Sequence, residues 1–302
     1  MPLTSPSVAL PSFAGGVPQF DGADRGVPSR RTMVTWQLPP TGQDTLSLSA
    51  FQTKNTPPLA VPPQQSPLPK APDPATYRSA IAALPGAESM PPEIYHALIE
   101  LGQIQNPPWA DTYLRSIGVD VLFKNGMEAL NLITSKGIRV DFGDMGNSKA
   151  HAQWLKDENL IMINQRYQGD TSKATLYAIS EAIYHEAGHA SRNGDNQASI
   201  QEEINCLGMN TLGYLYHVMT DADYAANTSN SRLIQDGVAL YAKLFFDPDP
   251  NKLALIGRVI EKYGYLPAHT PDHPIPVLPG KVPLTYLVLE QLQNRRAKEW
   301  IG

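Results

Sequence analysis

Apolar residues recur with the period of an α-helix along most of the chain after residue 90. Such spacing gathers apolar side chains on one face of a helix. It predicts helices over 91–104, 110–118, 126–137, 170–191, 196–221, 231–246, 250–264 and 284–299. Alternation of apolar and polar residues predicts a strand over 138–144 and a hairpin over 150–167, with the polar turn KDEN. Elements in this order are typical of an α+β fold.

The first 75 residues show neither period. Eighteen of the 28 prolines stand before residue 93, and aromatic residues are few in this stretch. A segment rich in Pro, Ser and Thr buries too little apolar surface to offset the conformational entropy lost on folding. We therefore predict a disordered arm over 1–75 and a folded domain over 76–265. A proline-rich crossing and a C-terminal helix, 266–302, should pack on that domain.

The net charge and the single cysteine limit the kinds of partner and the cellular compartment that we expect. The net charge is −5 without a long basic run, so we expect neither nucleic acid nor an anionic membrane as a partner. No apolar run reaches the ~18–20 residues of a membrane span. Cys206, the only cysteine, excludes an intrachain disulfide. The N-terminus lacks the basic start of a signal peptide, so we expect a cytoplasmic protein, or export without such a peptide, with the arm contacting a partner or secretion machinery.

The sequence HEAGH, residues 185–189, lies deep in the predicted helix 170–191. His185 and His189 are four residues apart, so their imidazoles lie on one helical face, one turn apart. Two nitrogen ligands at that separation can bind one Zn²⁺. Glu186 is offset by ~100° from His185, where it reaches a metal-bound water more easily than the metal, as a general base does. A plainer interpretation is a pair of histidines favoured by the C-terminal end of the helix dipole.

A hydrolytic zinc site needs a third protein ligand. In the predicted helix 196–221, Glu203 falls at the edge of the apolar face that contains Ile200, so it should point at the preceding helix. Glu202 falls almost opposite and should face solvent, and it is the last of the three candidates for this ligand. Asp195 is the main rival of Glu203, because it follows the second histidine by six residues, although it also suits the cap of the second helix. We predict His185, His189 and Glu203 as the metal ligands.

HExxH on one helix and a glutamate early in the next resembles the gluzincin metallopeptidases, the thermolysin-like enzymes and their compact relatives. The hairpin over 150–167 is similar to the edge hairpin that precedes the HExxH helix in these enzymes and holds a peptide as an added strand. The resemblance covers about 150–220. It implies a zincin-like α+β domain, a Zn²⁺ cofactor and a peptide or protein substrate. The chain departs from the family in its short interval between His189 and Glu203, and in Leu207, where the family carries an acidic residue.

The resemblance also implies a His or Tyr donor for the developing oxyanion. Tyr214 and His217 lie on the same side of the second helix as the predicted third ligand, so they are the local candidates for catalysis beside Glu186. Ordinary positions at the rim of a helix pair explain them slightly better. Asp236 could orient a ligand histidine, or pair with Arg232 one turn earlier. His273 has no ligand spacing and should be a loop residue.

Three functions fit this sequence. The first is a zinc endopeptidase with Glu186 as general base, which we favour. The second is a zinc-binding protein without turnover, which acts in interaction or structure. The third is a zinc hydrolase of a non-standard amide, such as a cell-wall bond. Retention of Glu186 argues against the second function, because a structural site has no need of a base.

Overall fold

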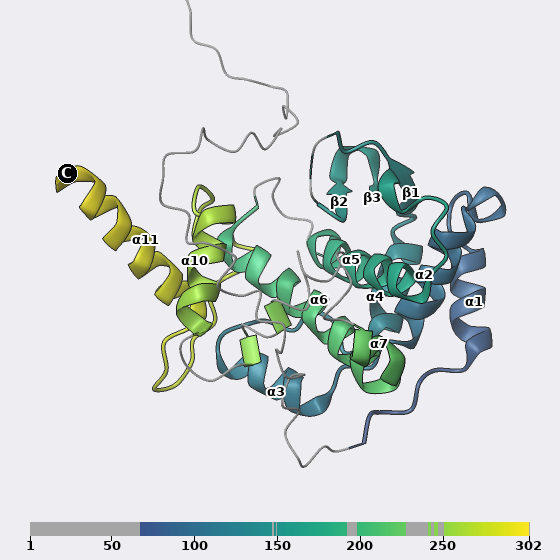
Figure 1. The fold of residues 1–302 in the computed structure, drawn as a ribbon, viewed down its shortest axis with the longest axis horizontal. Helices are drawn as coiled ribbons and strands as arrows, with labels where there is room; N and C mark the ends of the chain where they lie inside the picture. The colour runs from purple at the N-terminus through teal and green to yellow at the C-terminus, as the bar shows by residue number, and fades with distance from the viewer. Residues whose placement is uncertain are drawn as a thin grey trace, which may run out of the picture. The chain divides into compact units, whose positions relative to one another are not determined.

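A computed structural model describes residues 67–146, 148, 150–191, 198–227, 241–242, 245–246 and 251–301. The predicted arm over 1–75 lies outside the described residues except for its last nine positions. Most of the predicted helix over 231–246 lies outside them as well. The described residues form helices around one small sheet, which confirms the α+β class (Figure 1). None of the described helices combines the length and apolar character of a membrane span.

The described chain begins with a helix that the sequence pattern did not predict, α1 (Pro74–Ala82). Asp73 caps it by accepting the Ala75 N–H. Only Tyr77 and Ile81 are buried in its nine residues, which is too few to produce a visible helical period. The folded part therefore begins slightly before residue 76, the boundary expected from composition.

Three predicted helices follow: α2 (Pro92–Gln103), α3 (Pro108–Ser116) and α4 (Gly126–Ser135). Proline near the first position of α2 and α3 suits a helix start, because its missing N–H would have no partner there. Gly137 adopts φ +59° just after α4, which is the conformation that ends a helix before the chain enters the sheet.

The sheet contains β1 (Arg139–Gly143), β2 (Ala152–Leu155) and β3 (Leu160–Asn164) in the order β1-β3-β2. The predicted hairpin is confirmed, since β2 and β3 pair antiparallel around a short 3₁₀ turn. β1 pairs parallel with β3, a direction that alternation alone does not reveal. β2 is therefore an edge strand, and in Figure 1 it lies beside α5.

Two long helices form the centre of the fold: α5 (Lys173–Ser191) and α6 (Ile200–Thr220). Ser172 Oγ accepts the Thr175 N–H at the start of α5, and Ser199 Oγ accepts the Glu202 N–H at the start of α6. α5 packs against α6, α2, α4 and the sheet, so it is buried on nearly every side. This explains why HExxH lies among small apolar residues.

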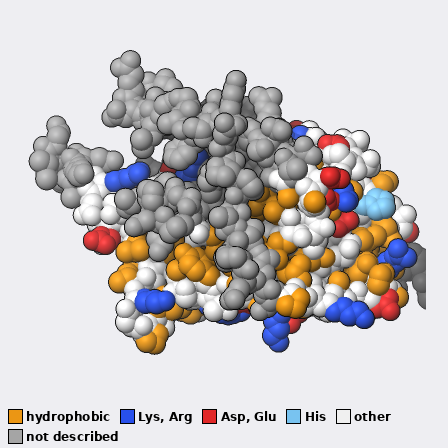
Figure 2. Space-filling model, turned by 60° about the horizontal axis from the view of Figure 1, so that its bottom comes forward, with side chains coloured by type: hydrophobic (Ala, Val, Ile, Leu, Met, Phe, Trp, Pro, Cys, Tyr) orange, Lys and Arg blue, Asp and Glu red, His pale blue; other side chains and the backbone are white. Residues whose placement is uncertain are grey.

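The C-terminal part comprises α7 (Ala222–Asn227), α10 (Asn251–Tyr263) and α11 (Leu284–Ile301). The proline-rich crossing, 264–283, joins the last two helices. Its backbone carbonyls at Pro267 and Ala268 accept the N–H groups of Ile200 and Gln201, at the start of α6. On the molecular face in Figure 2, apolar side chains occupy broad areas between scattered charged ones. The exposed large apolar residues of the described chain all belong to 265–286: Tyr265, Val277, Val282 and Tyr286.

Candidate metal centre

The two histidines of HEAGH meet at their ring tips. His185 Nε2 and His189 Nε2 are 3.1 Å apart, and both side chains are largely buried. Burial lowers the pKa of His185 well below its ordinary value, so this imidazole is neutral. Burial also opposes protonation of His189, but Cys206 and the neighbouring carboxylates outweigh it and raise the pKa of His189. The predicted arrangement of both imidazoles on one helical face is present.

Glu203 of α6 points at the same place. Its carboxylate oxygens lie 3.9 Å from His185 Nε2 and 3.8 Å from His189 Nε2. Zinc binds nitrogen and oxygen at ~2.0–2.2 Å, so two ligand atoms of a tetrahedral site are about 3.4 Å apart. The two ring nitrogens are 3.1 Å apart, whereas the 3.9 and 3.8 Å separations run to two different oxygens of Glu203, Oε2 and Oε1. Two imidazoles and one carboxylate are donor types that suit a zinc ion, and the carboxylate would have to turn one oxygen towards both nitrogens to bind it.

Cys206 is a second candidate for the third ligand, which sequence reasoning missed. Its thiol lies within 4.8 Å of a ring nitrogen of both His185 and His189. The thiol sits against the helix backbone, since a Cβ on Gly188 would be 2.8 Å from Cys206 Sγ. Burial raises the pKa of this thiol to about 12, so zinc would have to displace a tightly held proton. The carboxylate of Glu203 faces the Nε2 atoms of both histidines, so Glu203 and Cys206 are the two candidates for the third ligand.

Glu202 does not face solvent, and that prediction was wrong. Its Oε1 lies 2.7 Å from Nδ1 of His189, and only 12% of its side chain is exposed. A helical wheel describes direction about one axis and does not show what covers each side. Here α5 and the proline-rich crossing both pack on the first turns of α6, so this side of the helix is also buried.

Glu186 lies between its helix and the sheet. Its Oε2 accepts the backbone N–H of Trp154 at 2.8 Å, and the residue is only 8% exposed. Burial raises the pKa of Glu186 to about 7. His189 and the Trp154 N–H act against this, whereas Glu203 and Glu202 add to it. A carboxylate with a pKa near neutrality can both take and return a proton, as a general base requires.

Among the described residues, β2 pairs with a strand on one side only. Asn164 N–H donates to the His151 carbonyl, so residues 151, 153 and 155 use their backbone groups to pair with β3. In an antiparallel ladder the intervening residues turn the other way. Ala152 and Trp154 therefore direct their backbone groups to the outer edge, where Trp154 N–H meets Glu186.

Tyr263, near the end of α10, is another residue without a signal in the sequence. Its side chain hydrogen-bonds Glu203. Burial raises the pKa of Tyr263, and the charges of Glu203 and Glu186 contribute. The hydroxyl therefore stays protonated and holds the proposed ligand carboxylate. Period alone identified this segment as a helix but could not place one of its tyrosines at the site.

Tyr214 and His217 are not brought to the histidine pair. His217 Nδ1 lies 2.8 Å from Glu181 Oε1, and its ring stacks on Tyr177 at 4.0 Å between centroids. Tyr214 belongs to the same aromatic cluster. Glu181 precedes His185 by one helical turn, and Tyr177 precedes it by two, which are about 6 and 12 Å along α5. This corrects the role predicted for both residues. Their helix side was assigned correctly, since they do face α5.

The structure does not describe Asp195, Asp236 or Arg232, so the rival third ligand and the orienting carboxylate stay predictions.

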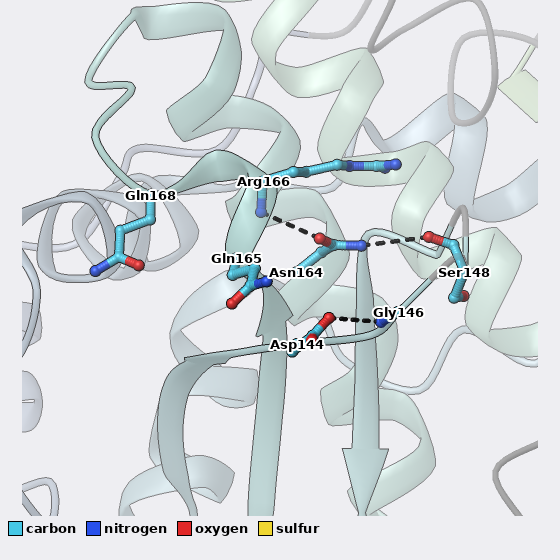
Figure 3. A pocket seen from close by; sticks show the side chains of 7 residues that line it. All are labelled: Asp144, Gly146, Ser148, Asn164, Gln165, Arg166 and Gln168. Carbon is cyan, nitrogen blue, oxygen red and sulfur yellow. Dashed lines mark hydrogen bonds between the residues drawn. The ribbon is translucent and has the colours of Figure 1, made fainter.

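An open hollow of about 570 Å³ lies beyond the ends of β1 and β3. Figure 3 shows that its polar groups largely bond one another: Asp144 accepts the Gly146 N–H, and Asn164 joins Arg166 N–H to the Ser148 carbonyl. None of the residues that face the histidine pair lines this hollow. Its size alone does not make it the reaction site.

No protein-family model, curated protein or solved structure matches this chain. The local geometry around HEAGH therefore carries the functional argument by itself.

Proposed function

We propose that the protein is a zinc-dependent endopeptidase with a zincin-like domain. The observation that carries the proposal is the convergence of His185 Nε2, His189 Nε2 and the Glu203 carboxylate, with Glu186 next to His185 in α5 and bonded to the backbone of the edge strand β2. A metal site with three protein ligands leaves one position for water or substrate, as hydrolytic zinc sites do. The placement of a small sheet on the HExxH helix supports the zincin-like comparison.

The side chains have distinct roles in this proposal. His185, His189 and Glu203 hold the ion, which when bound supplies a Lewis acid that acidifies water and polarises a carbonyl. Glu186 accepts the proton of the attacking water and passes it to the leaving amine nitrogen. The Trp154 N–H fixes one oxygen of Glu186, and so leaves the other oxygen for the proton. Tyr263 holds Glu203 in place.

The free edge of β2 favours a peptide over other amides. The outward backbone groups of Ala152 and the outward carbonyl of Trp154 can pair with an extended peptide, which would run past Glu186, while the Trp154 N–H stays with Glu186. Backbone pairing of this kind recognises a main chain in extended conformation regardless of its side chains. A cell-wall amide lacks a long main chain, so it would use this edge poorly.

The test combines metal analysis with digestion of an unbiased peptide library. We expect about one zinc per chain, removal of zinc by a strong chelator, and cleavage of peptides that stops on chelation. Glu186→Gln is the matched control, because it retains size and loses basicity; it should keep zinc and lose cleavage. A folded protein without any bound transition metal would refute the proposal. Zinc binding without cleavage of peptides would identify a non-catalytic zinc protein or a hydrolase of another amide.

A further inference from the structure

The proline-rich crossing packs on the part of α6 that carries the proposed zinc ligand. Its carbonyls at Pro267 and Ala268 accept the N–H groups of Ile200 and Gln201, which are the first residues of α6. These N–H groups have no partner within the helix. The crossing therefore caps α6 from outside and is held at a fixed distance from Glu202 and Glu203.

The crossing places one imidazole beside the centre. His273, in a turn closed by its own N–H to the Thr270 carbonyl, is only 2% exposed. Its Nε2 lies 4.0 Å from Glu202 Oε1, and its Nδ1 lies 3.4 Å from the amide of Asn205. Asn205 is itself fixed, because its Oδ1 accepts the Asp120 N–H and the Gln201 side-chain amide. The backbone bond to Thr270 and the contact with Asn205 therefore place His273 with its Nε2 directed at Glu202, beyond hydrogen-bond distance.

The same oxygen of Glu202 that faces His273 also meets His189. Glu202 Oε1 is 2.7 Å from His189 Nδ1, while Nε2 of that ring faces His185 and Glu203. A carboxylate on Nδ1 keeps the proton there, leaves Nε2 free to bind a metal, and fixes the plane of the ring. His273, Glu202 and His189 therefore form one line from the crossing to the site.

We propose that Glu202 and His273 are positioning residues for the zinc ligand His189. The proline-rich crossing would then help to set the zinc affinity of the metal centre through His273. Glu202 orients the ligand ring, and His273 with Asn205 keeps the Glu202 carboxylate in place. This inference rests on the proposed zinc site. It assigns a role to a histidine whose sequence context predicts an ordinary loop residue.

The test measures zinc affinity by competition with a chelating dye, on the full chain. Loss of a residue that orients a ligand lowers metal affinity about 10–100-fold, and we expect a loss in this range for Glu202→Ala. Glu202→Gln keeps an acceptor for the Nδ1 proton of His189, so it should retain part of the zinc affinity that Glu202→Ala loses. His273→Ala should weaken zinc several-fold and shift the absorption bands of the Co²⁺-substituted protein. His269→Ala is the matched control, because His269 lies in the same crossing and is exposed; it should match the parent.

A double-mutant comparison separates positioning from general stability. If His273 acts through Glu202, His273→Ala should have little further effect in the Glu202→Ala protein. Thermal unfolding of the metal-free variants shows whether each one is folded. The inference is overturned if His273→Ala binds zinc and Co²⁺ like His269→Ala, or if it lowers affinity by the same factor in both backgrounds. A parent protein that binds no zinc overturns the proposed function as well, so the two failures are distinguishable.

Discussion

His217 provides a quantitative test of the placement of the aromatic cluster away from the metal centre. The perturbation is His217→Gln, which keeps a side chain able to hydrogen-bond Glu181 and removes the titrating ring. In the structure His217 is 1% exposed, stacks on Tyr177 and contacts Glu181, which is also buried. If His217 donated to the reaction, this change would lower turnover strongly; we expect cleavage near the parent rate at about pH 7.5.

The magnitude follows from the pKa of the imidazole. Burial lowers the pKa of His217 from 6.5 to about 3. The unfolded chain therefore binds a proton that the folded protein excludes, so this stability is present above pH 6.5 and is lost as the pH falls towards 3. One pKa unit corresponds to ~1.4 kcal/mol, so the loss from about pH 7.5 to about pH 4.5 is roughly 2.6 kcal/mol. Burial raises the pKa of Glu181, which has the opposite effect over acidic pH.

The assay is urea unfolding of parent and variant, both free of metal, at several pH values between about 7.5 and 4.5. The difference between the two proteins cancels the titratable groups that they share and that do not contact residue 217. The unfolding free energy of His217→Gln, relative to the parent, should rise by roughly 2.6 kcal/mol on acidification. A free-energy difference that stays constant or falls on acidification would refute this prediction. That result would show that His217 is protonated in the folded protein and forms an ion pair with Glu181, whereas we expect both side chains to be neutral.

Three other predictions concern the centre and the arm. Glu203→Ala should lose zinc and Cys206→Ala should keep it; the reverse result in metal analysis would make the thiol the ligand. Burial raises the pKa of Glu186 from 4.5 to about 7, so the stability that its protonated form contributes is lost as the pH rises through 7. Urea unfolding of the metal-free proteins at about pH 8.5 should therefore show Glu186→Gln to be more stable than the parent by about 3 kcal/mol. Equal stability of the two proteins would contradict this. Trace protease should cut within 1–66 and leave a product beginning before Asp73, because Tyr77 is buried in α1. Mass spectrometry of the product identifies its first residue, and a chain that stays uncut within 1–66 would contradict the prediction.

Local patterning predicted the elements that carry enough residues to show a period. The helices from α2 to α6 and the hairpin of β2 and β3 were predicted because each presents a repeated apolar face to the core. α1 was missed because two inward residues make no period. The parallel pairing of β1 with β3 was missed because alternation marks a strand and does not fix the direction of its partner.

The same limits apply to the candidate centre. The spacing of His185 and His189 and the phase of Glu203 predicted which side chains face one another, since both depend on a single helix. Depth along the helix pair was not predictable in this way. His217 shares the side of Glu203 but lies fourteen residues later, about 21 Å along α6, where it meets an earlier part of α5. Contacts made by the crossing depend on a long connection, and no local period reports them.

Three buried carboxylates around two imidazoles require a physical explanation. Glu202 and Glu203 lie in the first turn of α6, where the helix dipole favours negative charge, and His189 lies in the last turn of α5, where it favours positive charge. The helix dipole therefore explains why acidic and basic residues occupy these positions. It does not explain why their side chains point into the protein, because the dipole would favour the same charges on exposed side chains. Here Glu186 and Glu203 are buried, and burial raises the pKa of both carboxyl groups while each is close to other acids. His189, whose pKa is raised, offsets part of that cost in the metal-free protein. A bound divalent cation would offset it through attraction to both carboxylates, and would displace the His189 proton on binding its ring nitrogen.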